Sequence, residues 1–264
     1  MTTPATVLVA PKKHQGLILA MSAVFFPLYF GADHTKVVKM PYEEFIGKAH
    51  DFLILKKRSV LETDNTYRQL LPYTVVTQDG ADGVTRYLPF ERMPTAGEPG
   101  LHGKVSVGWG GHIDAVDLVY GIDAVASEAA APLHNSSIDL ARTVWQSSCR
   151  EIKEEIQIHD ATGAERSSGY EITPTEWMIV NSDNQVCLKH VALVQRAHFL
   201  ADRVLSCREP ELKLLPAMTG AELLASGLPL EPWTRLLLEA ESNVALQPQD
   251  GSPEEAVEAL TETV

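Results

Sequence analysis

Three glutamates, Glu151, Glu154 and Glu155, crowd the short segment REIKEEIQ at 150–157. On a helix, residues three and four apart are neighbours, so the three carboxylates would project from adjacent positions with Arg150 beside them. Like charges at this spacing repel one another. Either solvent screens the repulsion and the cluster is ordinary surface, or a cation lies among the carboxylates.

A pair of glycines upstream favours the cation. The predicted strand at 104–109 runs into Gly110 and Gly111, and paired glycines mark a place where the backbone turns sharply or approaches another group closely. A hard divalent cation such as Mg²⁺ takes oxygen ligands, usually one or two carboxylates with substrate phosphate and water. The backbone carbonyl of Gly110, at the end of such a strand, can be a further ligand.

The helix that carries the glutamates is predicted to begin with Ser137 as its N-cap and Asp139 in its first turn. Its apolar stripe leaves out all three glutamates. The stripe is traced by Ala141, Val144 or Trp145, Ser148 or Cys149, Ile152 and Ile156.

The segments around this helix predict a mixture of strands and helices. The apolar run at 17–30 is too short to span a bilayer comfortably and reads as a buried strand or helix. Helical spacing follows in Phe45, Ala49, Phe52 and Leu53, and the turn residues QDGADG predict a hairpin. Further strands are expected at 6–10, 176–181 and 185–199, and helices at 219–227 and 231–240.

Composition narrows the class of partner and compartment. The 264 residues carry a formal net charge of −13, which disfavours a nucleic-acid backbone or an anionic membrane as the main partner. The cysteines at 149, 187 and 207 are odd in number and widely spaced, so neither a disulfide framework nor a zinc site is suggested. A reduced cytoplasmic setting fits best, and the oligomeric state stays open.

The segment at 150–158 resembles the second half of the Nudix hydrolase box, G-x5-E-x7-R-E-U-x-E-E-x-G-U, where U is aliphatic. The start of the box is similar to GGHID at 110–114, and the resemblance extends over 52–241 to a little-characterised phosphoesterase-like branch. Three departures are apparent: a long insertion follows the glycines, Arg142 stands where the middle Glu is expected, and Gln157 replaces the closing Gly.

The resemblance implies an α/β fold, namely a Nudix-type α/β/α sandwich with a mixed sheet, an N-terminal extension and an insertion inside the box. It implies hydrolysis, dependent on Mg²⁺ or Mn²⁺, of a pyrophosphate bond in a nucleoside diphosphate linked to another moiety. Glu154, Glu151 and Arg150 would be the catalytic residues, and Gly110, Glu151, Glu154 and Glu155 the metal ligands. Some relatives take the general base from a later loop, where Asp183, Glu209 and Glu211 are the candidates.

Substrate-binding candidates follow less directly from the residues. Arg92 and His102 flank the strand that leads to the glycines and could contact a phosphate or a base, or belong to a solvated loop. Trp109 and Trp177 could stack on a nucleobase or pack in the core. His112 and His190 have local hydrogen-bonding roles as their simplest interpretation.

Two classes of function remain: an active pyrophosphohydrolase acting on a small nucleotide-type substrate, and a Nudix-fold protein that binds a nucleotide or a protein without turning it over. Retention of the three glutamates favours the enzyme. The expected organisation is an N-terminal extension at 1–68, a Nudix domain at 69–245 and an acidic tail at 246–264. The insertion at 115–136 is expected to be a lid or a packing surface, because it has little basic charge.

Overall fold

The structure is a computed structural model that describes residues 16–31, 36–95, 99–120, 138–180 and 189–246. Three predictions lie outside these ranges: the strand at 6–10, the N-cap Ser137 and the candidate base Asp183. The predicted acidic tail at 246–264 lies outside them except for its first residue. No described helix is long and apolar enough to cross a membrane.

The described strands and α-helices alternate along the chain as far as the strand at 67–79; that strand begins the first of two runs of strands, which are separated by the helix at 140–155 and followed by two more helices. The strands are β1 (Leu17–Ser22), β2 (Val37–Lys39), β3 (Leu53–Lys57), β4 (Tyr67–Asp79), β5 (Thr85–Tyr87), β6 (Phe90–Arg92), β7 (Val105–Ser106), β8 (Gly108–Trp109), β9 (Ile156–His159), β10 (Glu165–Arg166), β11 (Tyr170–Ile179), β12 (His190–Phe199), β13 (Val204–Cys207) and β14 (Leu212–Leu214). The α-helices are α1 (Phe25–Phe30), α2 (Tyr42–Ala49), α3 (Arg58–Leu61), α5 (Leu140–Glu155), α6 (Gly220–Ala225) and α7 (Pro232–Leu246), with 3₁₀ turns η2 (His50–Phe52), η3 (Pro99–Leu101) and η4 (Ala115–Asp117).

The main sheet is mixed and has the strand order β2-β11-β12-β4-β1-β3, with β5 and β8 also paired to β4. β12 and β4 run parallel, whereas β1 is antiparallel to both β4 and β3. Two smaller sheets, β10-β9-β13 and β14-β6-β7, extend the structure beyond the end of α5. The predicted hairpin is present, because β4 pairs antiparallel with β5 across the turn at 80–84.

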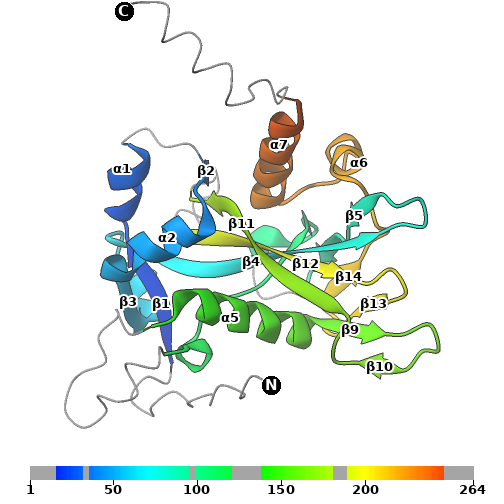
Figure 1. Cartoon of the computed structure of the whole chain (residues 1–264), viewed down its shortest axis with the longest axis horizontal. Helices are drawn as coiled ribbons and strands as arrows, with labels where there is room; N and C mark the ends of the chain where they lie inside the picture. Colours follow the sequence, from blue (N-terminus) through cyan, green and yellow to red (C-terminus); the bar gives the residue numbers. More distant parts are fainter. Residues whose placement is uncertain (1–15, 32–35, 96–98, 121–137, 181–188, 247–264) are drawn as a thin grey trace, which may run out of the picture.

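Helices cover both faces of the main sheet, as Figure 1 shows for α5 and α7. Successive residues of a strand point to opposite faces. Leu193 of β12 packs in the cluster that contains Leu140 and Val144 of α5, whereas Val194 packs with Leu237 of α7. The predicted α/β/α sandwich with a mixed sheet is therefore confirmed.

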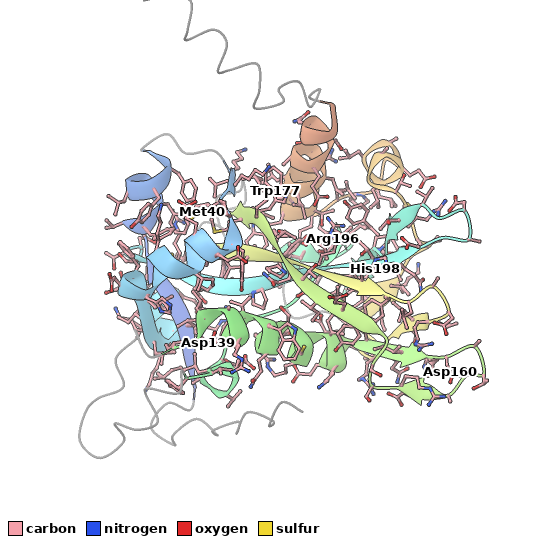
Figure 2. The ribbon with its side chains drawn as sticks, in the orientation of Figure 1. Met40, Asp139, Asp160, Trp177, Arg196 and His198 are labelled. Carbon is pink, nitrogen blue, oxygen red and sulfur yellow. The ribbon has the colours of Figure 1, made fainter. Side chains whose placement is uncertain are left out.

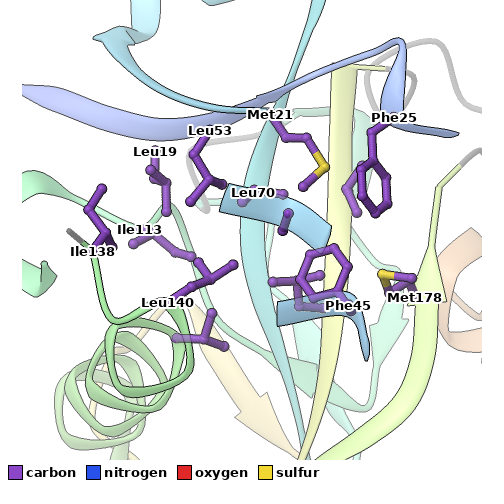
Figure 3. Packing of buried hydrophobic residues seen from close by; sticks show 14 of the residues in the cluster. Leu19, Met21, Phe25, Phe45, Leu53, Leu70, Ile113, Ile138, Leu140 and Met178 are labelled. Carbon is purple, nitrogen blue, oxygen red and sulfur yellow. The ribbon is translucent and has the colours of Figure 1, made fainter. Parts of the chain in front are cut away.

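The N-terminal region contributes to the same sheet and core. The apolar run at 17–30 forms β1 and then α1, as its length predicted, and β1 lies between β4 and β3. Figure 3 shows Met21 and Phe25 from this region packed with Leu70 and Leu140. The domain boundaries at 68/69 and 245/246 remain predictions.

Two local predictions are wrong. The helical spacing ends at Ala49, because Phe52 lies in the 3₁₀ turn η2 and Leu53 begins β3. The strand at 104–109 is broken into β7, which pairs with β6 in a small sheet, and β8, which pairs with β4 in the main sheet. Only the β8 half belongs to the mixed sheet as expected.

Candidate functional site

Helix α5 carries the three glutamates and begins two residues later than predicted. Asp139 is the N-cap, and its side chain accepts a hydrogen bond from the backbone N–H of Arg142. Figure 2 shows Asp139 at the start of α5 and Asp160 beyond its far end, in the β9–β10 turn. The assignment of Asp139 to the first turn, after a Ser137 cap, is therefore wrong.

The predicted stripe of α5 is buried at Val144, Ser148 and Ile152, but the buried face is wider than the stripe and includes one glutamate. Trp145 is 52% exposed, whereas Glu151 is only 8% exposed. The residues buried in the helix are Leu140, Thr143, Val144, Ser147, Ser148, Glu151 and Ile152. One of the three glutamates thus lies on the inward face, where an unpaired charge is costly.

The helix ends at Glu155 without a glycine. Ile156, its C-cap, is already extended with φ −117° and ψ 132°, and the chain continues directly into β9. Gln157 pairs there with Ser206 of β13. Because the chain leaves the helix as a strand, no left-handed residue is needed, which explains how Gln157 replaces the closing Gly of the box.

The two glycines are required by close contacts on different sides. Gly110 has φ +153°, and a Cβ atom there would lie 2.0 Å from the backbone oxygen of Pro72. A Cβ atom at Gly111 would lie 2.7 Å from Glu151 Oε1. The structure therefore sets Glu151 against Gly111.

These contacts predict unequal effects for alanine at the two positions. Gly110→Ala forces apart two backbone segments, so we expect it to destabilise the protein by about 1–3 kcal/mol. Gly111→Ala meets only the end of a side chain that can move, so its effect on stability should be smaller. Urea unfolding of both variants checks this order, and a larger loss for Gly111→Ala would contradict it.

Arg150 joins the elements of the site. Its Nη1 atom donates to Glu151 Oε1 at 2.8 Å and to Glu154 Oε2 at 2.9 Å, while its Nη2 atom donates to the carbonyl oxygen of His112 at 3.0 Å. The Nε and Nη2 atoms bind the two carboxylate oxygens of Asp117, each at 2.9 Å. This placement suits a residue that orients two of the glutamates.

Asp117 is a site residue that the sequence reasoning missed. It is 1% exposed, lies in η4, and also accepts a hydrogen bond from the backbone N–H of Asp114. Five residues separate Gly111 from Asp117, which is the spacing of the acidic position in the G-x5-E half of the box. The acidic residue is therefore present as Asp117, and the long insertion follows it.

The placement of Asp117 also shifts the start of the insertion, which was predicted at residue 115. Ala115 and Leu118, at the start of the segment predicted to be a lid or a packing surface, are each 2% exposed and pack in the core beside Ile113. The remaining residues of the predicted insertion, from 121 on, lie outside the described residues. The described residues on either side of 121–137 lie together, because Tyr120 and Ile138 form an antiparallel bridge and the backbone N–H of Asp139 donates to the carbonyl oxygen of Val119.

The three glutamates differ in their electrostatic surroundings. Glu154 is exposed and paired with Arg150. Burial raises the pKa of Glu151 to about 7, against the opposing attraction of Arg150. Burial, followed by the charge of Glu151, raises the pKa of Glu155 to about 8, and Arg92 only partly offsets this. Glu155 Oε2 is buried and has no hydrogen-bond partner in the described part of the chain.

A divalent cation fits this pair of carboxylates. An unpartnered buried oxygen and two raised pKa values indicate negative charge that lacks compensation, and carboxylate oxygens are the ligands that Mg²⁺ prefers. As the side chains stand, however, no three described His, Cys, Asp or Glu residues are arranged to hold a metal. Arg150 draws Glu154 and Glu151 toward itself, so the expected trio of ligands is not assembled in this conformation.

Of the other predicted site residues, two act on the charge of Glu155. Arg92 and Glu209 are close enough to Glu155 to affect its pKa. His102 follows η3, and Glu211 accepts from the backbone N–H of Met93 through its carbonyl oxygen. For His112, burial, and then the charge of Arg58, lower the pKa to about 4.

The tryptophans are placed differently from one another. Trp109 is 0% exposed and packs against Phe90 with ring centroids 4.2 Å apart. A nucleobase cannot reach it there, so its assignment as a substrate-binding residue is corrected to a core position. Trp177 lines an open groove with Tyr42 and Arg196 and packs on the α7 side of the sheet, away from α5 (Figure 2).

Comparisons with known proteins bear on the fold. No protein-family model matches the chain. Protein YmaB of Bacillus subtilis (strain 168) is 25% identical over 185 residues, which are 69% of this chain and 75% of that protein. The crystal structure of Tm1382, a proposed Nudix hydrolase, has a TM-score of 0.59 at 20% identity and covers 86% of this chain and 99% of its own.

A more distant likeness is to the NUDIX domain of Shewanella oneidensis NrtR complexed with ADP ribose. Its TM-score is 0.36 at 13% identity, with 78% of this chain and 99% of that chain covered. This score is too low to carry an argument about the site. The likeness to Tm1382 shows that the chain has the Nudix fold, so the resemblance seen in the sequence is confirmed at the level of the fold.

Proposed function

We propose that the protein hydrolyses a pyrophosphate bond in a nucleoside diphosphate linked to another moiety, with Mg²⁺ as cofactor. The observation that carries the proposal is the half-buried carboxylate of Glu155, whose Oε2 atom is buried and lacks a partner within the described residues, together with the buried Glu151. A purely structural helix gains nothing from two such groups, since burying them costs free energy.

The residues of the chain would divide the work as follows. Glu151 and Glu155, with Glu154 after release from Arg150, would hold the cation, and the carbonyl of Gly110 is a further candidate ligand. The guanidinium of Arg150 would orient Glu151 and Glu154 through its ion pairs with both. Asp117 would orient Arg150 in turn through the hydrogen bond that it accepts from Nε. Arg92, next to Glu155, can contact a phosphate oxygen.

The bound cation would supply Lewis acidity toward the phosphate oxygens and lower the pKa of a bound water. The attacking water also needs a general base. We propose Glu154, which is exposed, or Glu209, which lies in the loop after β13 and acts on the charge of Glu155, for that role.

Release of phosphate tests the proposal directly. Nucleotide sugars, ADP-ribose, dinucleoside polyphosphates and an oxidised nucleotide would be incubated with the protein and Mg²⁺, with a coupled phosphatase to convert the products. We expect turnover of at least one class that stops on addition of a chelator. A protein that turns over none of them, yet gains thermal stability from Mg²⁺, would instead be a Nudix-fold binding protein.

The raised pKa values predict how stability depends on pH without metal. The folded-state pKa of Glu155 is about 8 and that of Glu151 about 7, both above the ordinary value of 4.5. Between pH 4.5 and 8 the folded protein therefore binds more protons than the unfolded chain, so stability falls as the pH rises.

Melting temperatures from pH 5 to 9 measure this decline. Glu155→Gln should flatten it and raise the melting temperature at pH 8 by at least about 2 °C. Glu154→Gln is the matched control, because Glu154 is exposed; it should change the slope less than Glu155→Gln does, since the charge of Glu154 is a minor cause of the raised pKa values of Glu151 and Glu155. If the melting temperatures of the wild type and both variants decline equally with pH, the pKa of Glu155 is not raised in the folded protein.

A further inference from the structure

Arg208, in the loop that follows β13, binds the end of α5. The last carbonyl groups of a helix have no partner within the helix. Here the backbone N–H of Arg208 donates to the carbonyl oxygen of Glu155 at 2.7 Å, and its Nε atom donates to that of Lys153 at 3.1 Å. One residue thus binds two carbonyl groups of the helical turn that carries Glu154 and Glu155.

Neighbouring strands fix the position of Arg208. Its Nη2 atom pairs with Glu165 of β10 at 2.6 Å, and the preceding residue, Cys207, pairs with Ile156 in the β13–β9 ladder. These strands form the small sheet beyond the end of α5 (Figure 1). Because the side chain of Arg208 is 41% exposed, its ion pair with Glu165 adds little to stability, whereas its bonds to the two carbonyl groups define where the loop lies against the helix.

The same loop leads to two other residues of the candidate site. Glu209 directly follows Arg208, and the loop ends at Leu212, which lies opposite Arg92 in the β14–β6 pairing. The charges of Arg92 and Glu209 both act on Glu155. The contact between Arg208 and α5 therefore connects the helix end to the two charged side chains that lie near the Glu155 carboxylate.

We propose that Arg208 is a positioning residue for the carboxylate site: by binding the last turn of α5, it sets where Glu155 and Glu209 lie relative to each other. The proposal rests on the proposed function, in which Glu155 holds Mg²⁺ and Glu209 is a candidate base. Arg208 contacts the helix through backbone carbonyl groups, so it acts by placing the carboxylates. Replacing residues that orient metal ligands typically costs about 10–100-fold in metal affinity or activity.

Arg208→Gln tests this role, because it removes the Nε donor and the pair with Glu165 but keeps the backbone N–H. We expect binding of Mg²⁺ alone, measured by calorimetry, to weaken at least about fivefold, and kcat for a substrate from the panel to fall at least about tenfold. KM at saturating Mg²⁺ should change by less than about twofold, since Arg208 does not bind the substrate. A purely structural role would lower the melting temperature and leave both Mg²⁺ affinity and kcat unchanged in the folded protein.

Arg166→Gln is the matched control. Arg166 lies beside Glu165 in β10 and is also exposed, but its ion pair is with Asp160 of the same hairpin. This variant should bind Mg²⁺ as the wild type does. Glu165→Gln removes only the partner of Nη2, so its effect on Mg²⁺ affinity should be smaller than that of Arg208→Gln.

Two results would overturn the inference. One is Arg208→Gln protein that binds Mg²⁺ with the affinity of the wild type; the other is an equal loss of affinity in Arg166→Gln, which would reflect only the loss of a positive charge from this sheet. If the wild type binds Mg²⁺ but hydrolyses nothing, the proposed function fails and the Mg²⁺ affinities alone decide about Arg208. A wild type that neither binds Mg²⁺ nor hydrolyses any compound refutes the proposed function and the inference with it.

Discussion

Replacing Glu155 by glutamine is expected to lower Mg²⁺-dependent pyrophosphate hydrolysis at least about 100-fold. Loss of a residue that only supports a metal ligand typically costs 10–100-fold, and loss of a ligand should cost at least as much. The same change removes a buried carboxylate whose pKa is raised to about 8, so the free protein should become more stable. Activity and stability are thus expected to move in opposite directions.

This combination separates a metal site from a structural role. A structural residue would lose stability and activity together. Mg²⁺ stabilises only a state that binds it, so millimolar Mg²⁺ should raise the melting temperature of the wild type and not that of Glu155→Gln. A Glu155→Gln protein with normal hydrolysis, or with a lowered melting temperature in the absence of metal, would refute this role for Glu155.

The second large effect is expected at Asp117. Asp117→Asn keeps the shape of the side chain but removes the charge that binds Arg150 through two hydrogen bonds. Breaking a fully buried pair costs about 3–5 kcal/mol; since Arg150 is partly exposed, we expect about 2–4 kcal/mol here. Released from Asp117, Arg150 should also hold Glu151 and Glu154 less firmly, so hydrolysis should fall at temperatures where the variant is fully folded.

Asp114→Asn is the control for this variant. Asp114 lies three residues away, is about half exposed, and approaches Arg150 only to 4.0 Å, while asparagine can still cap η4. Urea unfolding should give nearly wild-type stability for Asp114→Asn and a clear loss for Asp117→Asn. Equal values for the two variants would show that the Arg150–Asp117 pair contributes nothing to the fold.

The sequence predicted the fold because its strongest local patterns agree with the tertiary structure. The turn residues between β4 and β5 specify a hairpin, and the box glutamates lie at helical spacing on α5. Where the local sequence pattern was weaker, contacts with distant parts of the chain determined the structure. The apparent strand at 104–109 divides between two sheets because β7 pairs with β6 and β8 with β4, and no pattern within six residues reports such a division.

The sequence predicted most of the residues of the candidate site, but not which of them are buried or which residues they contact. Residue type and spacing identified Arg150 and the three glutamates, but placed all three glutamates outside the apolar stripe of the helix. Burial of Glu151 depends on its contact with Gly111, which comes from a distant part of the chain. Asp117 follows Gly111 at the spacing of the first half of the box, whereas Arg142 lies in the helical register of the missing Glu relative to Arg150; the insertion between the two halves makes these positions differ.

The most direct test of the account is the rate of phosphate release from the panel of nucleoside diphosphate derivatives, with and without Mg²⁺, for the wild type and Glu155→Gln. The account predicts that the wild type hydrolyses at least one of them only with Mg²⁺ and that Glu155→Gln loses this rate at least about 100-fold. A wild-type rate that does not depend on Mg²⁺, or an equal rate in the two proteins, would contradict a metal-dependent carboxylate site at the end of α5.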